Sequence, residues 1–369
     1  MELLDELSAL SRAVSVHGEE GELARLLGWR WSMWLDEWRQ DRLGNFIGLV
    51  RGSGPGPRPR VLAAAHLDGV GLMVTRIEEG GFLRVTAVGG ADRRHLLGQQ
   101  VEVRGRRRLT GIIGAKPPHL TTPEERKTLP PFEELYVDLG LPEDEVREAV
   151  PPGTAVLCRQ EVSALRNGRV AGSHLDNTAG LAVMGLAVRE LFRLRDAPGR
   201  RKLAGLREEA GFPDFYAVGT VGEETGRFPG ATAAAFGLEP DIAIAVDVTY
   251  GALPGEDDPT GTFALESGPT VGIGPNCHPG LTTFLRETAA GAGIALGLEV
   301  LPGNSGTDAW VMQTARGGIP TAVLSVPLRY MHTPVETVSL ADLRDAGRLL
   351  ALAAAGFTPE LARSVTSQW

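Results

Sequence analysis

The sequence predicts an α/β fold, a mixed sheet flanked by helices, with a small β-barrel domain inserted into it. Short apolar runs such as 61–65 and 215–221 are rich in small and β-branched residues, as buried parallel strands are. Helical apolar spacing lies between such runs, for example over 178–195. From Val70 to Gly168 the pattern changes to short strands divided by glycine turns, which indicates a separate compact β domain.

The N-terminal region is predicted to combine two helices with the first strands. Apolar residues recur at helical spacing over 3–14 and about 19–33. Asp41–Asn45 is a turn signal between two strand-like runs and is typical of a hairpin. The run 61–65 is then a buried strand, and it ends in the segment His-Leu-Asp-Gly at 66–69.

The inserted unit carries a Pro-rich loop at 114–131. Within it Thr122, Pro123 and Glu125 have the arrangement of a capping box with proline at the first helical position, which predicts a short helix. The strand-like runs of the unit are 70–77, 82–88, 100–104, 109–115 and 154–159.

The α/β pattern resumes at 173–177, where a short polar segment leads into the helix 178–195. The strand 215–221 stops at Gly222 and delivers two adjacent carboxylates, Glu223 and Glu224. The later predicted elements are a helix near 228–236, strands at 242–246 and 320–326, a loop at 304–308 that leads into a helix, and a C-terminal helix that begins at Ser339.

Composition excludes several classes of partner. A net charge of −9 argues against nucleic acid or an anionic membrane as the main partner. The acidic, amphipathic N-terminus does not resemble a secretory signal, and no apolar run approaches membrane-spanning length, so we expect a cytoplasmic protein. Cys158 and Cys277 do not form a disulfide framework or a metal-binding Cys pair.

Strands of the α/β part repeatedly end in a side chain that can bind a metal. Open α/β sheets place ligands beyond the carboxyl ends of parallel strands, so these side chains are predicted to converge. Imidazoles and carboxylates without thiolates suit zinc, cobalt or manganese in an open catalytic site, and do not suit a closed structural zinc. The predicted ligands are His66, Asp176, Glu224, Asp247 and His332.

Charge balance predicts two divalent ions. Three ligand carboxylates contribute about −3 and two ions about +4, which leaves a positive charge that lowers the pKa of bound water. Consecutive residues at a strand end point in different directions, so Glu224 can bind metal while Glu223 acts as general base. Asp68, two residues after His66, is predicted to accept the second imidazole N–H and fix the tautomer.

Six motifs mark these positions: HLDGVG at 66–71, LDNTAG at 175–180, VGEETG at 221–226, AVDVT at 245–249, SGTDAW at 305–310 and PLRYMHTPVE at 327–336. As a set they resemble the tetrahedral aminopeptidase family, which includes glutamyl and deblocking aminopeptidases and some members with the older label of endoglucanase. The likeness spans nearly the whole chain, including GAKPPHLTTPEERK at 114–127.

The resemblance implies a zinc-peptidase-like catalytic domain and an inserted PDZ-like dimerisation domain, assembled from dimers into a hollow dodecamer. The corresponding boundaries here are 1–70 with 169–369, and 71–168. The implied activity is removal of N-terminal residues from peptides that carry a free amino terminus.

The resemblance also implies a role for each site residue. His66, Asp176 and Asp247 would hold one ion, and Asp176, Glu224 and His332 the other. Glu223 would be the base, and Asp308 would lie on the substrate side.

Three alternatives remain open at this point. A dinuclear deacylase or dipeptidase would share the metal chemistry but not a requirement for a free amine. An endoglucanase needs two carboxylates that flank a sugar, whereas the adjacent residues Glu223 and Glu224 diverge. An assembly scaffold with a relict site would bind no metal.

Overall fold

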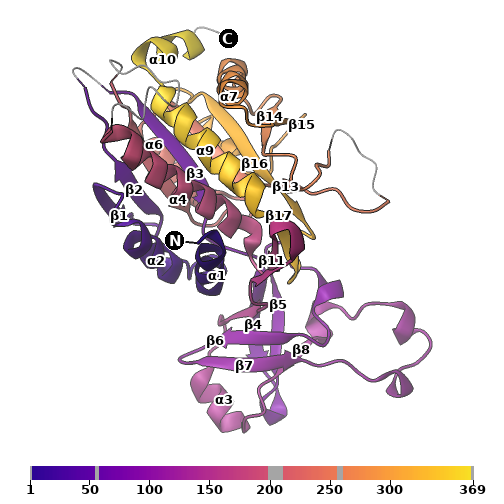
Figure 1. Ribbon diagram of the computed structural model, residues 1–369. Coiled ribbons are helices and arrows are strands. Elements are labelled where there is room, and N and C mark those ends of the chain that lie inside the picture. Colours follow the sequence, from indigo (N-terminus) through magenta and orange to yellow (C-terminus); the bar gives the residue numbers. More distant parts are fainter. Residues whose placement is uncertain (1, 55–57, 198–210, 256–260, 367–369) are drawn as a thin grey trace.

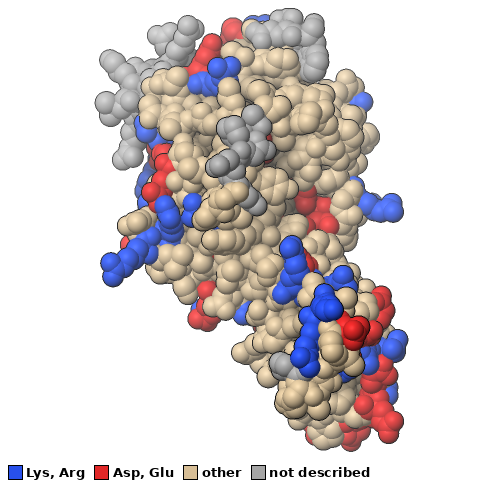
Figure 2. Space-filling model, turned by 90° about the vertical axis from the view of Figure 1, so that its right-hand side faces the viewer, with Lys and Arg blue, Asp and Glu red and all other residues tan. Residues whose placement is uncertain are grey.

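The computed structural model describes residues 2–54, 58–197, 211–255 and 261–366. These residues form a mixed sheet with helices on both faces and, beside one end of that sheet, a closed β-barrel (Figure 1). The predicted α/β fold with an inserted barrel is therefore confirmed. Figure 2 shows the barrel as a smaller lobe that projects from the larger one, with basic and acidic side chains mixed over its visible surface.

The sheet is built around four parallel strands. Within the described part of the chain its order is β1 (Glu37–Gln40), β2 (Phe46–Val50), β12 (Asp214–Thr220), β3 (Arg60–His66), β13 (Ile242–Tyr250), β16 (Thr321–Arg329), β17 (Glu336–Ser339), β11 (Arg169–Gly172) and β10 (Ser163–Ala164), while β14 (Thr270–Ile273) pairs with β15 (Gly297–Val300) and with β16. The pairs β12–β3, β3–β13 and β13–β16 are parallel, so their carboxyl ends share one edge. The predicted hairpin is the antiparallel pair β1–β2.

Helices cover both faces of the sheet because its central strands are apolar on both sides. Along β3, Val61 and Ala63 belong to the core under one set of helices, whereas Leu62 and Ala64 belong to the core under the other. The helices over the core of Val61 and Ala63 are α1 (Leu3–Ala13), α2 (Gly21–Trp31), α4 (Leu175–Arg195), α7 (Pro279–Ala292), α9 (Leu340–Gly356) and α10 (Pro359–Thr366). Those over the core of Leu62 and Ala64 are α6 (Pro229–Leu238) and α8 (Ala309–Met312).

None of the described helices has the length and hydropathy needed to cross a lipid bilayer.

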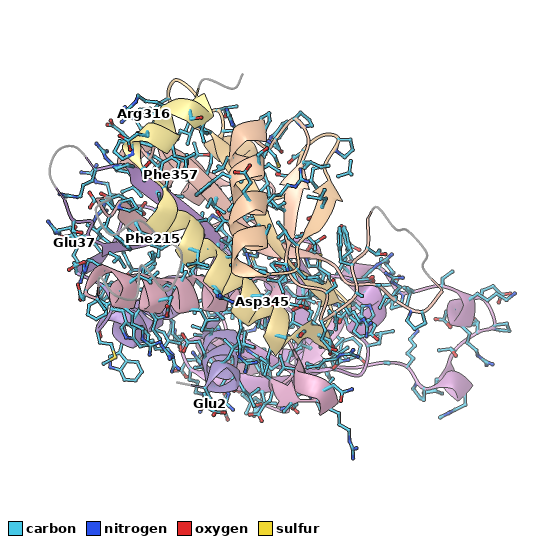
Figure 3. All side chains as sticks on the ribbon, turned by 45° about the horizontal axis from the view of Figure 1, so that its top comes forward. Glu2, Glu37, Phe215, Arg316, Asp345 and Phe357 are labelled. Carbon is cyan, nitrogen blue, oxygen red and sulfur yellow. The ribbon has the colours of Figure 1, made fainter. Side chains whose placement is uncertain are left out.

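The larger core contains aromatic rings that come from distant parts of the chain. Phe215 of β12 and Phe357, which follows α9, have no exposed surface. The ring of Phe357 lies 6.3 Å from that of Phe284 in α7. Figure 3 shows Phe215 and Phe357 between the helices and the sheet, while the exposed residues Glu2 and Glu37 lie at the outside.

The barrel is built from β4 (Gly71–Ile77), β5 (Leu83–Val88), β8 (Tyr136–Asp138), β7 (Arg108–Ile113), β6 (Gln100–Arg104) and β9 (Ala155–Cys158), in that order around the ring. The sequence patterns do not predict β8 or the helix α3 (Glu143–Ala149), whose Val146 and Ala149 enter the barrel core. The capping box is confirmed, since Thr122 and Glu125 bond reciprocally at 2.7 and 3.2 Å, but it opens only one 3-10 turn.

Gly347 of α9 lies against α4 with no room for a side chain. A Cβ at this position would come 2.7 Å from the Cβ of Leu186 and 3.2 Å from the carbonyl oxygen of Val183. We therefore expect Gly347→Ala to force the two helices apart and to lower the free energy of unfolding by about 1–3 kcal/mol, as overpacking does. Denaturant unfolding followed by circular dichroism measures the change.

Gly237→Ala is the matched control. It makes the same substitution in α6, at an exposed position where a new Cβ meets nothing within 4 Å. Because alanine favours a helix over glycine, it should leave stability unchanged or raise it by about 0.5–1 kcal/mol. Equal effects of the two substitutions would contradict the close approach of α4 and α9.

Candidate metal centre

The five predicted ligands come from separate elements that meet at the carboxyl edge of the parallel strands. His66 is the last residue of β3, and Asp247 lies in β13, two residues after Ala245, which pairs with Ala64 of β3. Glu224 follows the end of β12, and His332 follows β16. Asp176 lies in the first turn of α4. The strand register therefore brings together residues that are up to 266 positions apart in the chain.

The ligand atoms approach one another around Asp176. His66 Nε2 lies 3.1 Å from Asp176 Oδ1 and 3.7 Å from Asp247 Oδ1. On the other side, His332 Nε2 lies 3.4 Å from Asp176 Oδ2 and 3.5 Å from Glu224 Oε1. Each carboxylate oxygen of Asp176 thus faces a different imidazole.

These separations fit ligands that share a metal ion. Nitrogen and oxygen ligands at their usual distance from zinc are about 3.4 Å apart in a tetrahedral arrangement. Ligand atoms of His66, Asp176 and Glu224 all lie within 4.8 Å of one another. The buried Oε1 atom of Glu224 accepts no hydrogen bond from the described residues. The donor set therefore suits a divalent cation.

Electrostatics lead to the same conclusion. Burial, followed by the charge of Asp247 and opposed by that of His66, raises the pKa of Glu223 to about 10. Burial and the charge of Asp176 raise the pKa of Glu224 to about 8. Carboxylates that are desolvated and placed beside like charges resist ionisation unless positive charge lies between them. Bound metal cations would supply that charge.

The side chain of Asn177 fixes the start of α4, where Asp176 lies. Asp176 and Asn177 depart from helical geometry at the start of α4, and the peptide bond between them is cis. The Asn177 amide donates to the carbonyl of Val246 at 2.9 Å and accepts from the N–H of Gly180 at 2.8 Å. This side chain ties α4 to β13 one residue before Asp247.

The role predicted for the Asp68 carboxylate differs from what the structure shows. The imidazole Nδ1 of His66 lies 2.8 Å from the backbone carbonyl of Asp68, and the nearer carboxylate oxygen is 4.0 Å away. That carboxylate instead accepts the backbone N–H groups of Glu223 and Glu224 at 3.0 and 3.1 Å. The chain turns after β3, so the carbonyl reaches the imidazole and the side chain reaches the next loop.

Glu336 was assigned no role from the sequence, although it lies in the PLRYMHTPVE motif. Its buried carboxylate accepts the backbone N–H of Asp176 at 3.0 Å and that of His332 at 2.8 Å. It therefore holds the backbone of two predicted ligands. The sequence feature that could have indicated this role is the position of Glu336 at the first residue of β17, four residues after the predicted ligand His332.

Glu223 and Asp308, the predicted base and the predicted substrate-side residue, are both buried. Glu223 is buried and lines the cavity. Asp308 is also buried, and it accepts a hydrogen bond from the Thr220 hydroxyl at 2.5 Å. The loop residues 304–307 line the cavity, whereas Asp308 itself does not. That Asp308 lies on the substrate side stays a prediction.

A cavity of about 380 Å³ opens beside the centre, and the barrel borders the centre on another side. Gly89 and Gly90 follow β5, and a Cβ at Gly90 would come 2.6 Å from His332 Nδ1. A Cβ at Gly89 would lie 3.3 Å from the carbonyl oxygen of Glu224. Glycine is therefore needed where the barrel meets the predicted ligands.

Known proteins are similar to this chain in sequence and in fold. The model of the M42 glutamyl aminopeptidase family matches residues 44–349. A lysyl aminopeptidase from Pyrococcus furiosus is 36% identical over 326 residues, which cover 87% of this chain and 86% of that protein.

Two solved structures resemble the whole chain. The aminopeptidase APDkam598 from the archaeon Desulfurococcus kamchatkensis has a TM-score of 0.86 and 32% identity, and the match covers 98% of this chain and 97% of that one. The dodecamer PhTET1-12s has a TM-score of 0.81 and 28% identity, with 97% and 100% covered. Together with the family match and the convergent site, these likenesses show that the chain belongs to the M42 glutamyl aminopeptidase family, whose members are metal-dependent hydrolases.

Proposed function

We propose that this centre binds two divalent metal ions and removes single residues from the amino terminus of peptides. The observation that carries the proposal is the position of Asp176, whose two oxygens face His66 and His332 at 3.1 and 3.4 Å. In the proposed centre Asp176 would be a ligand of both ions, His66 and Asp247 would complete the ligands of one, and Glu224 and His332 would complete those of the other. Nitrogen and oxygen ligands without thiolates suit zinc, cobalt or manganese.

The residues around the ions have separate tasks in this mechanism. When bound, the ions supply a water of lowered pKa and polarise the scissile carbonyl. Glu223 is the general base, which takes a proton from the attacking water and then gives it to the leaving amine. Asp68 fixes the backbone of Glu223 and Glu224 through the two N–H groups that its carboxylate accepts. We also propose that Asp308 acts from the substrate side of the loop 304–308.

We further propose that residues 71–168 form a dimerisation domain, and that residues 1–70 with 169–369 form the catalytic domain. The closed barrel, which contains no strand of the large sheet, supports this division as far as β9, whereas β10 pairs with β11 of the large sheet. The likeness to a dodecameric structure along nearly the whole chain supports assembly of dimers into a dodecamer. Size-exclusion chromatography with light scattering would test the assembly.

The alternatives are separated by their substrates. An endoglucanase would hydrolyse a cellulose substrate, and the family match instead favours an aminopeptidase. A dinuclear deacylase would accept blocked amines. Chelator-sensitive hydrolysis of aminoacyl p-nitroanilides, with no turnover of their N-acetylated forms, is the expected result for the proposed function.

Glu223→Gln is expected to lower kcat by about 10²–10⁴-fold, because a positioned general base contributes that much. Its metal content should stay unchanged, since Glu223 is not a proposed ligand. Glu224→Gln is the matched comparison: the same change on the neighbouring residue should also weaken metal binding. Steady-state kinetics and elemental analysis measure both quantities. A Glu223→Gln enzyme with full activity would remove the proposed base.

Glu336→Gln should weaken metal binding by about 10- to 100-fold, because residues that orient metal ligands typically have effects of that size. The two N–H groups bond to different oxygens of Glu336, and in Gln one of these positions becomes an NH2 group, which cannot accept a hydrogen bond. Titration against a chromophoric chelator measures the affinity.

Asp342→Asn is the control for Glu336. Asp342 is also buried and also accepts two backbone N–H groups, those of Glu266 and Gly268, but it does not line the cavity. It should lower stability without changing metal affinity. If both substitutions weaken metal binding equally, Glu336 has no special role at the centre.

A further inference from the structure

The cavity beside the centre contains a carboxylate that the proposed metal binding does not use. Glu299 of β15 lines this cavity at the edge of the sheet formed by β14 and β15. The described residues of the lining include other acids, namely Asp176, Glu223, Glu224 and Asp247, all of which belong to the centre. Glu299 is therefore a negative charge that remains for the part of a substrate that enters the cavity.

Hydroxyl groups hold the Glu299 carboxylate in one orientation. The hydroxyl of Thr249 donates to Oε1 at 2.7 Å, and that of Thr270 donates to Oε2 at 3.1 Å. Burial, together with the nearby charge of Asp247, raises the pKa of Glu299, and the hydrogen bonds from Thr249, Thr270 and Ser325 only partly oppose this rise. Several donors that converge on both oxygens form an environment that suits an ionised carboxylate, which only accepts hydrogen bonds.

The strand register places this carboxylate within side-chain reach of the centre. Ser325 of β16 pairs with Asp247 of β13 on one side and with Thr270 of β14 on the other. Neighbouring strands are about 4.8 Å apart, so Thr270 lies about 10 Å from Asp247 across the sheet. Thr249 lies two residues beyond Asp247 on the same face of β13. A residue bound at the centre can therefore extend its side chain toward Glu299.

The rest of the cavity suits a long side chain with a positive end. Phe228, Leu301 and Val323 line it and offer apolar surface to a methylene stem. Among the described lining residues there is no Lys or Arg, so no ammonium or guanidinium group of the cavity wall pairs with Glu299 or would pair with an acidic substrate side chain.

We propose that Glu299 selects peptides whose N-terminal residue is Lys or Arg, by pairing with the ammonium or guanidinium group at the far end of the cavity. This inference rests on the proposed aminopeptidase function, and it gives that function a substrate class. A bound cation would satisfy the carboxylate oxygens and favour their charged form.

The test compares p-nitroanilides of Lys, Arg, Leu and Glu on the metal-loaded full-length protein and on Glu299→Gln. The wild-type protein should give its highest kcat/KM with Lys and Arg and its lowest with Glu. Glu299→Gln keeps the shape but removes the charge, so kcat/KM for Lys and Arg should fall about 10- to 100-fold, mainly through KM. The value for Leu should change by less than about threefold.

A second readout does not depend on turnover. Calorimetric titration should show L-lysine binding more tightly than L-leucine to the wild-type protein, and Glu299→Gln should abolish that difference. Glu287→Gln is the matched control, because it removes one negative charge from an exposed position on α7 outside the cavity. It should leave both the kinetic and the binding preference unchanged.

Each outcome distinguishes this inference from the proposed function. If the wild-type protein prefers Leu or Glu, or if Glu299→Gln lowers kcat/KM equally for all four substrates, the role of Glu299 is wrong while the aminopeptidase remains. If no aminoacyl substrate is hydrolysed, the proposed function fails, and equal binding of L-lysine and L-leucine would then also overturn the selection by Glu299. The wild-type profile alone decides the matter if Glu299→Gln does not fold.

Discussion

The structure depends on the crowding of negative charge at one edge of a sheet. Asp176, Glu223, Glu224 and Asp247 are largely withdrawn from water at one site, and an imidazole nitrogen of His66 or His332 lies within 3.7 Å of Asp176, Asp247 and Glu224. Such a group is stable only if bound protons or cations neutralise it. The parallel strands create this situation, because they place their ends, and whatever side chains follow, along a single line. In the proposed function, the cations that would neutralise these carboxylates are also the ions that would activate water.

Carboxylates that bind backbone N–H groups set the geometry of this edge. Asp68 holds the loop of Glu223 and Glu224, and Glu336 holds the backbone of Asp176 and His332. Each carboxylate joins two segments that are distant in the sequence and that both carry proposed ligands. The precision of the centre therefore comes from residues that need not touch a metal ion. Removal of Glu336 would affect two proposed ligands, and removal of Asp68 would affect the proposed base and one proposed ligand.

The sequence could predict which side chains end the central strands, because buried strands appear as short apolar runs and the residue after such a run is easy to read. His66, Glu224 and Asp247 follow from that pattern. The partners of Asp68 and Glu336 could not be predicted in the same way. These partners are backbone N–H groups, which every residue other than proline carries, so they leave no trace in residue identity.

The edge of the sheet that carries Glu299 was also beyond prediction. β14 and β15 each have four residues, and β15 alternates between exposed and partly exposed positions, so neither gives a long apolar run. Their pairing depends on β16, which lies later in the chain. The barrel strand β8 has only three residues and was missed for the same reason.

The contact of Gly89 and Gly90 with Glu224 and His332 has a consequence for how this enzyme can be shortened. A miniature version that joined the end of β3 directly to β11 would keep every proposed ligand and the base in its sequence. It would nevertheless lose Asp68, whose carboxylate holds the loop of Glu223 and Glu224, and the glycine backbone that lies against His332. A shortened protein would therefore need a substitute for both contacts.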